Sequence, residues 1–265
     1  MSAAAARADW VDGLRGVAVV WMVAYHFCFD LNLLGFARFA MLSDPWWTTQ
    51  RTAIVSLFML SAGLSQVLAW RAGQTRRVFW RRWTEIAGCA GLVSVATWWM
   101  FGAAWIYFGV LHAMAVMWLL TRGGLVWLAS RPGFSWRVLL FVAALVGSSA
   151  WWVPALLHAM GATDGQALLN TRALSALGWV SHKPVTEDYV PLAPWMGVLW
   201  LGVAWGLWRW PSQVGQAQQP VVETAAAWAW SPRWLRFLGR HSLVVYMVHQ
   251  PVLLGALHGI KALQG

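Results

Sequence analysis

One apolar stretch near the N-terminus, WVDGLRGVAVVWMVAYHFCFDLNLL at residues 10–34, decides how this chain folds. It is long enough to cross a membrane as a helix, which takes about 20 mostly apolar residues. Arg15 lies near the start of the stretch, and His26 and Asp30 lie near its end. Titratable side chains inside a span are energetically costly and mark functional sites. We therefore expect this span to organise the fold and to hold candidate functional residues.

The rest of the chain repeats this pattern of apolar runs separated by short basic loops. Of its 265 residues 60% are hydrophobic and 11% are charged, whereas a soluble domain carries about 25% charged residues. The pattern predicts an all-α polytopic membrane helical bundle of about seven transmembrane helices, folded as a single domain over residues 1–265. It excludes soluble globular and fibrous proteins. The seven expected spans are residues 10–34, 51–70, 83–101, 104–120, 136–157, 188–208 and 235–260.

Basic residues predict how the bundle is oriented. If the N-terminus is cytoplasmic, 13 of the 19 Lys and Arg residues lie on the inner side, five lie on the outer side, and Arg15 lies within the first span. This asymmetry obeys the positive-inside rule. The net charge of +10 therefore reflects membrane loops, and we expect no nucleic-acid partner. The expected location is the cell inner (plasma) membrane, as a multi-pass protein without a removable signal peptide.

Three histidines from three expected spans reach similar depths. With a helical rise of 1.5 Å per residue, His26 lies about 22 Å from the inner end of its span. His112 lies about 12 Å below the outer face, and His249 about 21 Å above the inner end. Asp30 follows His26 by one turn on the same helix face. We expect these residues to converge in the outer half of the membrane, although each histidine alone could be a hydrogen-bonded packing residue.

Three further polar residues have a structural and a functional interpretation. Asp188 and Tyr189 open the sixth expected span on the outer side, where a carboxylate also suits a helix N-terminus. Arg15 could extend to the cytoplasmic surface, pair with Asp12, or face the bundle interior and hold an anionic group. The sequence leaves these alternatives open.

Histidine and carboxylate inside a bundle indicate proton-transfer chemistry. Imidazole is the usual general base near neutral pH, and beside a carboxylate it can deprotonate a hydroxyl or an amine for acyl transfer. Basic inner loops suit a donor that carries phosphate groups. This combination favours a protein that takes an acyl group from a cytoplasmic carrier and delivers it to an acceptor at the outer face.

Four segments carry a resemblance to a known family: DGLRG (12–16) followed by YHF (25–27), FGVLH (108–112), DYVPLAPWMG (188–197) and GRHSLVVYMVHQP (239–251). In this order they resemble the heparan-alpha-glucosaminide N-acetyltransferase catalytic-domain-like family of bacterial membrane proteins. The resemblance implies an acyltransferase that moves an acyl group, normally acetyl, from acyl-CoA to a sugar amine or hydroxyl. The lysosomal enzyme that names the family is expected to have Asn in place of His26 and its catalytic His in the following loop; here no His lies between His26 and His112.

On this basis we expect His26 to be the catalytic base and Asp30 to orient it. The expected substrate-binding residues are Arg15, His112, Asp188, Tyr189, His249 and Gln250. No metal or tightly bound cofactor is expected; acetyl-CoA, or another acyl-CoA, serves as co-substrate. The expected partners are membrane lipid, the acyl-CoA donor and a carbohydrate or glycolipid acceptor, and a homo-oligomer is left open.

Two other classes of function use the same polar residues. A lipid or sugar transporter or flippase would need the outer polar cluster without acyl chemistry, but inverted repeats, which are typical of such proteins, are not evident. A haem or metal protein would use paired intramembrane histidines as ligands, which leaves Asp30 and the basic inner loops without a role. Cys28 and Cys89 fall in expected spans without metal-ligand spacing, and they are expected to be packing residues.

Overall fold

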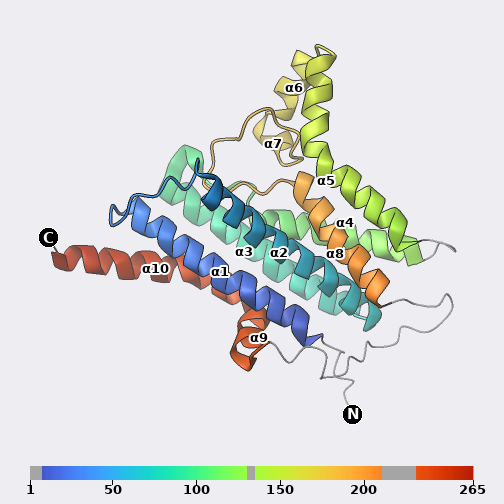
Figure 1. Cartoon of the computed structure of the whole chain (residues 1–265), viewed down its shortest axis with the longest axis horizontal. Helices are drawn as coiled ribbons and strands as arrows, with labels where there is room; N and C mark the ends of the chain where they lie inside the picture. The colour runs from blue at the N-terminus through green and yellow to red at the C-terminus, as the bar shows by residue number, and fades with distance from the viewer. Residues whose placement is uncertain (1–7, 130–134, 211–230, 265) are drawn as a thin grey trace. The chain divides into compact units, whose positions relative to one another are not determined.

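The computed structural model describes residues 8–129, 135–210 and 231–264, and these residues fold almost entirely into helices (Figure 1). Within the described ranges there is no strand, only an isolated parallel bridge between Phe108 and Tyr189. The elements are α1 (Asp9–Leu33), α2 (Pro45–Arg71), α3 (Arg76–Phe101), the 3₁₀ helix η1 (Gly102–Ala104), α4 (Val110–Ala129), α5 (Trp136–Ala159), α6 (Thr163–Leu169), α7 (Arg172–Ser175), α8 (Leu192–Arg209), α9 (Arg233–Arg240) and α10 (Ser242–Gln264).

Five described helices are long and apolar enough to cross a membrane: those that contain α1, α2, α3, α5 and α10. In α4 a shorter apolar segment, Val110–Leu125, accompanies them. The all-α polytopic membrane bundle is thereby confirmed, and the protein is a multi-pass membrane protein. The count of seven spans and the cytoplasmic N-terminus stay predictions.

The chain divides into two compact units. The first contains the described residues of 62–210, from the second half of α2 to α8. The second contains the described residues of 8–61 and 231–264, which form α1, the first half of α2, α9 and α10. That residues 1–265 form a single domain stays a prediction.

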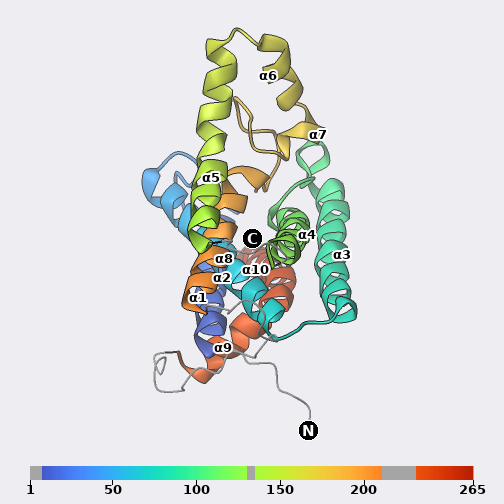
Figure 2. The same cartoon turned by 90° about the vertical axis from the view of Figure 1, so that its right-hand side faces the viewer.

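Close backbone contacts hold the helices of the first unit together. A Cβ added at Gly197 of α8 would lie 2.5 Å from the Ala143 carbonyl oxygen of α5, and one at Gly63 of α2 would lie 2.1 Å from the Leu199 oxygen. Small residues at such crossings let membrane helices approach closely. Figure 2 shows α5 passing along α8 and extending to α6, with α3 beside α4.

The expected fourth span starts later than predicted, at Val110 and not at residue 104. Gly102 ends α3 with φ +53°, a conformation that glycine adopts without a Cβ penalty. The chain then folds back on α3, where the Ile106 N–H donates to Thr97 Oγ1 (3.0 Å) and the Ile106 carbonyl accepts from Ser94 Oγ (2.8 Å). His112 is thus the third residue of α4, about 3 Å along its axis, and not about eight residues into the helix as the predicted depth of 12 Å assumed.

The expected seventh span, residues 235–260, is two helices that meet at His241. A continuous span would carry Arg236 and Arg240 toward the hydrocarbon, where a guanidinium is costly. Instead the arginine-rich segment forms α9, and the apolar helix α10 begins at Ser242. In Figure 1, α9 turns away from the line of α10. His249 therefore lies seven residues into α10, about 10 Å along its axis and not 21 Å.

Packing in the second unit centres on α1. The buried residues Met22, Tyr25, Met41 and Ile54 form its apolar core, and partly buried aromatic side chains, including Trp47, cover them. Helix α1 also contacts both α9 and α10. The start of α1 is thus fixed against α9, and its His26 region meets α10.

Candidate functional site

The His26 region of α1 and the middle of α10 form a polar cluster, called here the His26 cluster, of His26, Asp30, His249 and Gln250. The rings of His26 and His249 lie 4.9 Å apart between centroids in an edge-to-face arrangement. Asp30 is fully buried, and its Oδ1 accepts a 2.7 Å hydrogen bond from Gln250 Nε2. Two helices that are more than 200 residues apart in the sequence are joined here: His26 and Asp30, one turn apart on α1, contact the adjacent residues His249 and Gln250 of α10.

Backbone carbonyls determine the tautomers of both imidazoles. His26 Nδ1 lies 3.0 Å from the Met22 oxygen, and His249 Nδ1 lies 2.7 Å from the Tyr246 oxygen. Because a carbonyl only accepts hydrogen bonds, each Nδ1 must carry the proton. In the neutral ring Nε2 then holds a free lone pair. Both histidines are therefore oriented with Nε2 ready to accept a proton.

The His26 cluster has an excess of hydrogen-bond acceptors. Three of its buried atoms have no hydrogen-bond partner among the residues that the structure describes: Asp30 Oδ2, Gln250 Oε1 and His249 Nε2. With the tautomers above, all three are acceptors. A buried acceptor without a partner costs about 1–3 kcal/mol, so the cluster suits a molecule that brings hydroxyl or amine hydrogens.

Asp30 was expected to orient the His26 ring, but the two side chains have different hydrogen-bond partners. The Met22 carbonyl orients the His26 ring, while the Asp30 carboxylate bonds to Gln250 on the opposite helix. Asp30 thus ties α1 to α10. The catalytic assignment of both residues stays a prediction.

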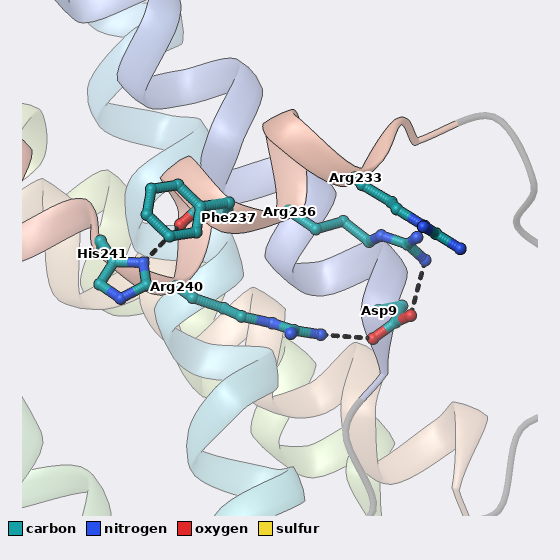
Figure 3. Close-up of a pocket in the computed structure, with 6 residues that line it drawn as sticks. All are labelled: Asp9, Arg233, Arg236, Phe237, Arg240 and His241. Atoms are coloured by element: carbon teal, nitrogen blue, oxygen red, sulfur yellow. Dashed lines mark hydrogen bonds and ion pairs between the residues drawn. The ribbon is translucent and has the colours of Figure 1, made fainter.

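A second group of charged residues joins the start of α1 to α9. Arg236 Nη1 donates to Asp9 Oδ2 (2.6 Å), and Arg240 bonds to Asp9 Oδ1 and to Asp12 Oδ2, both at 2.9 Å. Figure 3 shows guanidinium groups approaching Asp9 from two sides. The pKa of Arg240 is raised, mainly by its hydrogen bond with Asp12. The guanidinium therefore stays charged at any physiological pH. These ion pairs were not predicted.

Arg15 lies within this junction. Its Nη1 donates to Asp12 Oδ1 and to the Gly239 carbonyl oxygen, each at 3.4 Å. Of the alternatives that the sequence left open, pairing with Asp12 is therefore observed. The Arg15 side chain is partly exposed, with 20% of its surface accessible.

In the first unit, His112 has a hydrogen-bond partner for each ring nitrogen. The Gly109 N–H donates to Nδ1 (3.3 Å), so the proton is on Nε2, which donates to Ser94 Oγ at 2.9 Å. Ser94 in turn donates to the Ile106 carbonyl. This arrangement fixes the start of α4 to α3. The substrate-binding role of His112 stays a prediction, but the ring as it stands has no free nitrogen to offer.

Asp188 and Tyr189 lie beside the FGVLH segment. Asp188 Oδ2 accepts from the first N–H of α4, that of Val110 (3.0 Å), and so supports α4 and not the helix that follows it in sequence. A Cβ at Gly109 would lie 2.4 Å from this oxygen, which explains a glycine there. The Tyr189 hydroxyl donates to the Ser175 carbonyl at 2.6 Å. The two segments thus form one joint at the N-terminus of α4.

Replacing Asp188 with alanine is expected to destabilise the protein by about 0.5–2 kcal/mol, the usual cost of losing a helix N-terminal acceptor. Asp188→Asn keeps an acceptor oxygen and should lose less. Thermal unfolding of the detergent-purified protein measures both changes. Wild-type stability in both variants, together with a raised KM for an acceptor, would instead indicate that Asp188 binds substrate.

The chain matches a family model described as "Heparan-alpha-glucosaminide N-acetyltransferase, catalytic" over residues 7–251. The match covers nearly the whole chain, including the four segments quoted above and every candidate residue. No curated protein and no solved structure matches the chain.

Proposed function

Since the chain belongs to the heparan-alpha-glucosaminide N-acetyltransferase catalytic family, we propose that it is a membrane acyltransferase of the cell inner (plasma) membrane. It transfers an acyl group, normally acetyl, from a cytoplasmic acyl-CoA to a sugar amine or hydroxyl at the outer face. The acceptor is a carbohydrate or a glycolipid. The observation that carries the proposal is the His26 cluster, in which two imidazoles with Nε2 lone pairs contact each other on the same two helices that carry the buried acceptor oxygens of Asp30 and Gln250.

In the proposed step, His26 Nε2 removes the proton from the acceptor O–H or N–H. The acceptor atom then bonds to the thioester carbon, the carbon–sulfur bond breaks, and the thiolate of coenzyme A leaves. Protonated His26 returns the proton to that sulfur, so no oxidant or reductant is needed. A positioned base of this kind contributes about 10²- to 10⁴-fold to a rate.

The residues around His26 bind the acceptor and position the two helices in the proposed reaction. His249 Nε2 and the free oxygens of Asp30 and Gln250 are acceptors that bind and orient the hydrogens of a sugar. The Asp30–Gln250 hydrogen bond keeps α1 and α10 at the separation where the two imidazoles meet. Arg15 offers a positive charge on the same helix, toward its N-terminal end.

The proposal is tested by acetyl transfer in membranes. Membranes with and without the full-length protein are incubated with radiolabelled acetyl-CoA and a panel of amino sugars, neutral sugars and glycolipids. We expect label in an acceptor only when the protein is present. If coenzyme A is not bound and no acceptor is labelled, the acyltransferase proposal is wrong.

A further inference from the structure

We propose that the pocket beside α9 binds the phosphate groups of the acyl-CoA donor; this inference rests on the proposed function. The pocket has a volume of about 390 Å³ and is shown in Figure 3. This is within the range of small-molecule sites, about 300–1,000 Å³. It is lined by Asp9, Arg233, Arg236, Phe237, Arg240 and His241.

The charges of the pocket favour an anion. The lining holds three guanidinium groups and one carboxylate, Asp9, which binds Arg236 and Arg240; Arg240 also binds Asp12, just outside the lining. Arg233 makes no ion pair or hydrogen bond with any residue in the described ranges, yet its guanidinium points to the same region as that of Arg236 (Figure 3). Like charges held together in this way repel, and an anion between them relieves the repulsion.

Phosphate is the anion that this arrangement suits. Guanidinium groups bind phosphate through paired N–H donors, and such charge-assisted bonds are about twice as strong as neutral ones. The ion pairs with Asp9 and Asp12 hold Arg236 and Arg240 in place before a ligand arrives, which reduces the entropy lost on binding. The lining also contains the rings of Phe237 and His241, whose centroids lie 4.2 Å apart. A nucleotide suits such a pocket, because its phosphates can bind the guanidinium groups and its base can contact the rings.

The position of the pocket along α1 fits a long donor. Asp9 and Asp12 mark the pocket end, Arg15 follows, and His26 lies 14 residues beyond Asp12, about 21 Å along the helix. Acyl-CoA is an elongated molecule with its phosphates at one end and its thioester at the other. Phosphates at α9 would therefore leave the thioester directed toward the His26 cluster. The predicted orientation places α9 on the cytoplasmic side, where the donor is.

Equilibrium binding to the full-length protein in nanodiscs of neutral lipid tests the assignment. The ligands are coenzyme A and pantetheine, which lacks the nucleotide and its phosphates. Arg233→Gln should weaken coenzyme A binding at least about tenfold, since one charge-assisted contact is lost, and it should leave pantetheine binding unchanged. Arg233 has no partner to lose among the described residues, so the variant is expected to fold. The matched control is Arg38→Gln, an exposed arginine of the same unit away from the pocket.

The outcomes separate this inference from the proposed function. Equal coenzyme A affinity in the wild type, Arg233→Gln and Arg38→Gln would overturn the pocket assignment and leave the acyltransferase proposal intact. Loss of affinity for pantetheine as well would show a general structural effect and would also overturn it. A second set of nanodiscs contains anionic lipid: if the wild type retains that lipid and Arg233→Gln does not, while coenzyme A affinity is equal in both, the pocket is a lipid headgroup site and the assignment is overturned. No coenzyme A binding to the wild type contradicts both proposals.

Discussion

Replacement of His26 with alanine is expected to lower acetyl transfer by about 10²- to 10⁴-fold, the contribution of a positioned general base. The Met22 carbonyl holds the proton on Nδ1, so Nε2 of this ring is the base that the proposed step uses. The substitution removes the base but neither the Asp30–Gln250 hydrogen bond nor the α1–α9 ion pairs. Binding of the donor should therefore change little while kcat falls. Initial rates with labelled acetyl-CoA and the best acceptor measure the effect.

His158→Ala is the matched control, because His158 is exposed near the end of α5 and belongs to the other unit. It should transfer acetyl groups like the wild type. Equal rates for His26→Ala, His158→Ala and the wild type would contradict the assignment of His26 as the base. A fall in kcat for His249→Ala that matches the fall for His26→Ala, with the latter still binding donor, would show that the two rings act as a pair.

The sequence was sufficient to predict the meeting of His26 and His249, although the expected start of the helix that carries His249 was wrong. His26 lies in a helix that spans Asp9–Leu33 almost as expected. His249 was placed on a helix that begins at residue 235, whereas α10 begins at Ser242. Hydropathy finds where a span is apolar, but it does not show where an arginine-rich segment leaves the line of the helix. The alternation of Arg233, Arg236 and Arg240 with Trp234 and Phe237 was the available signal, because it is typical of an interfacial helix.

The role of His112 shows what hydropathy and residue type leave out. Its position in an apolar run made it look like His26, but the start of α4 depends on a turn at Gly102 and on contacts of Ile106 with α3. Only the folded chain brings the Gly109 N–H and Ser94 to the two nitrogens of the ring. The sequence alone does not distinguish a histidine with hydrogen bonds to both ring nitrogens, such as His112, from one whose Nε2 keeps its lone pair, such as His26.

Gly239→Ala is expected to have the largest effect on stability. A Cβ at this position of α9 would lie 1.8 Å from the Asp12 carbonyl oxygen and 2.9 Å from the Gly16 nitrogen of α1. Both neighbours are backbone atoms of a helix, so the added methyl can be accommodated only if α9 moves away from α1. Such overpacking costs about 1–3 kcal/mol, and the shift also weakens the hydrogen bonds that Arg240 makes with Asp9 and Asp12.

Gly255→Ala is the control for the same chemical change, because a Cβ at this position of α10 meets no atom of the described residues within 4 Å. The loss of soluble, monodisperse protein on heating in detergent compares the two variants with the wild type. We expect Gly239→Ala to aggregate at a clearly lower temperature and Gly255→Ala to match or exceed the wild type, since alanine favours a helix more than glycine does. If both variants behaved alike, close contact between α1 and α9 would not be what holds this unit together. Because the donor pocket is built on the same contact, Gly239→Ala should weaken coenzyme A binding, whereas Gly255→Ala should not.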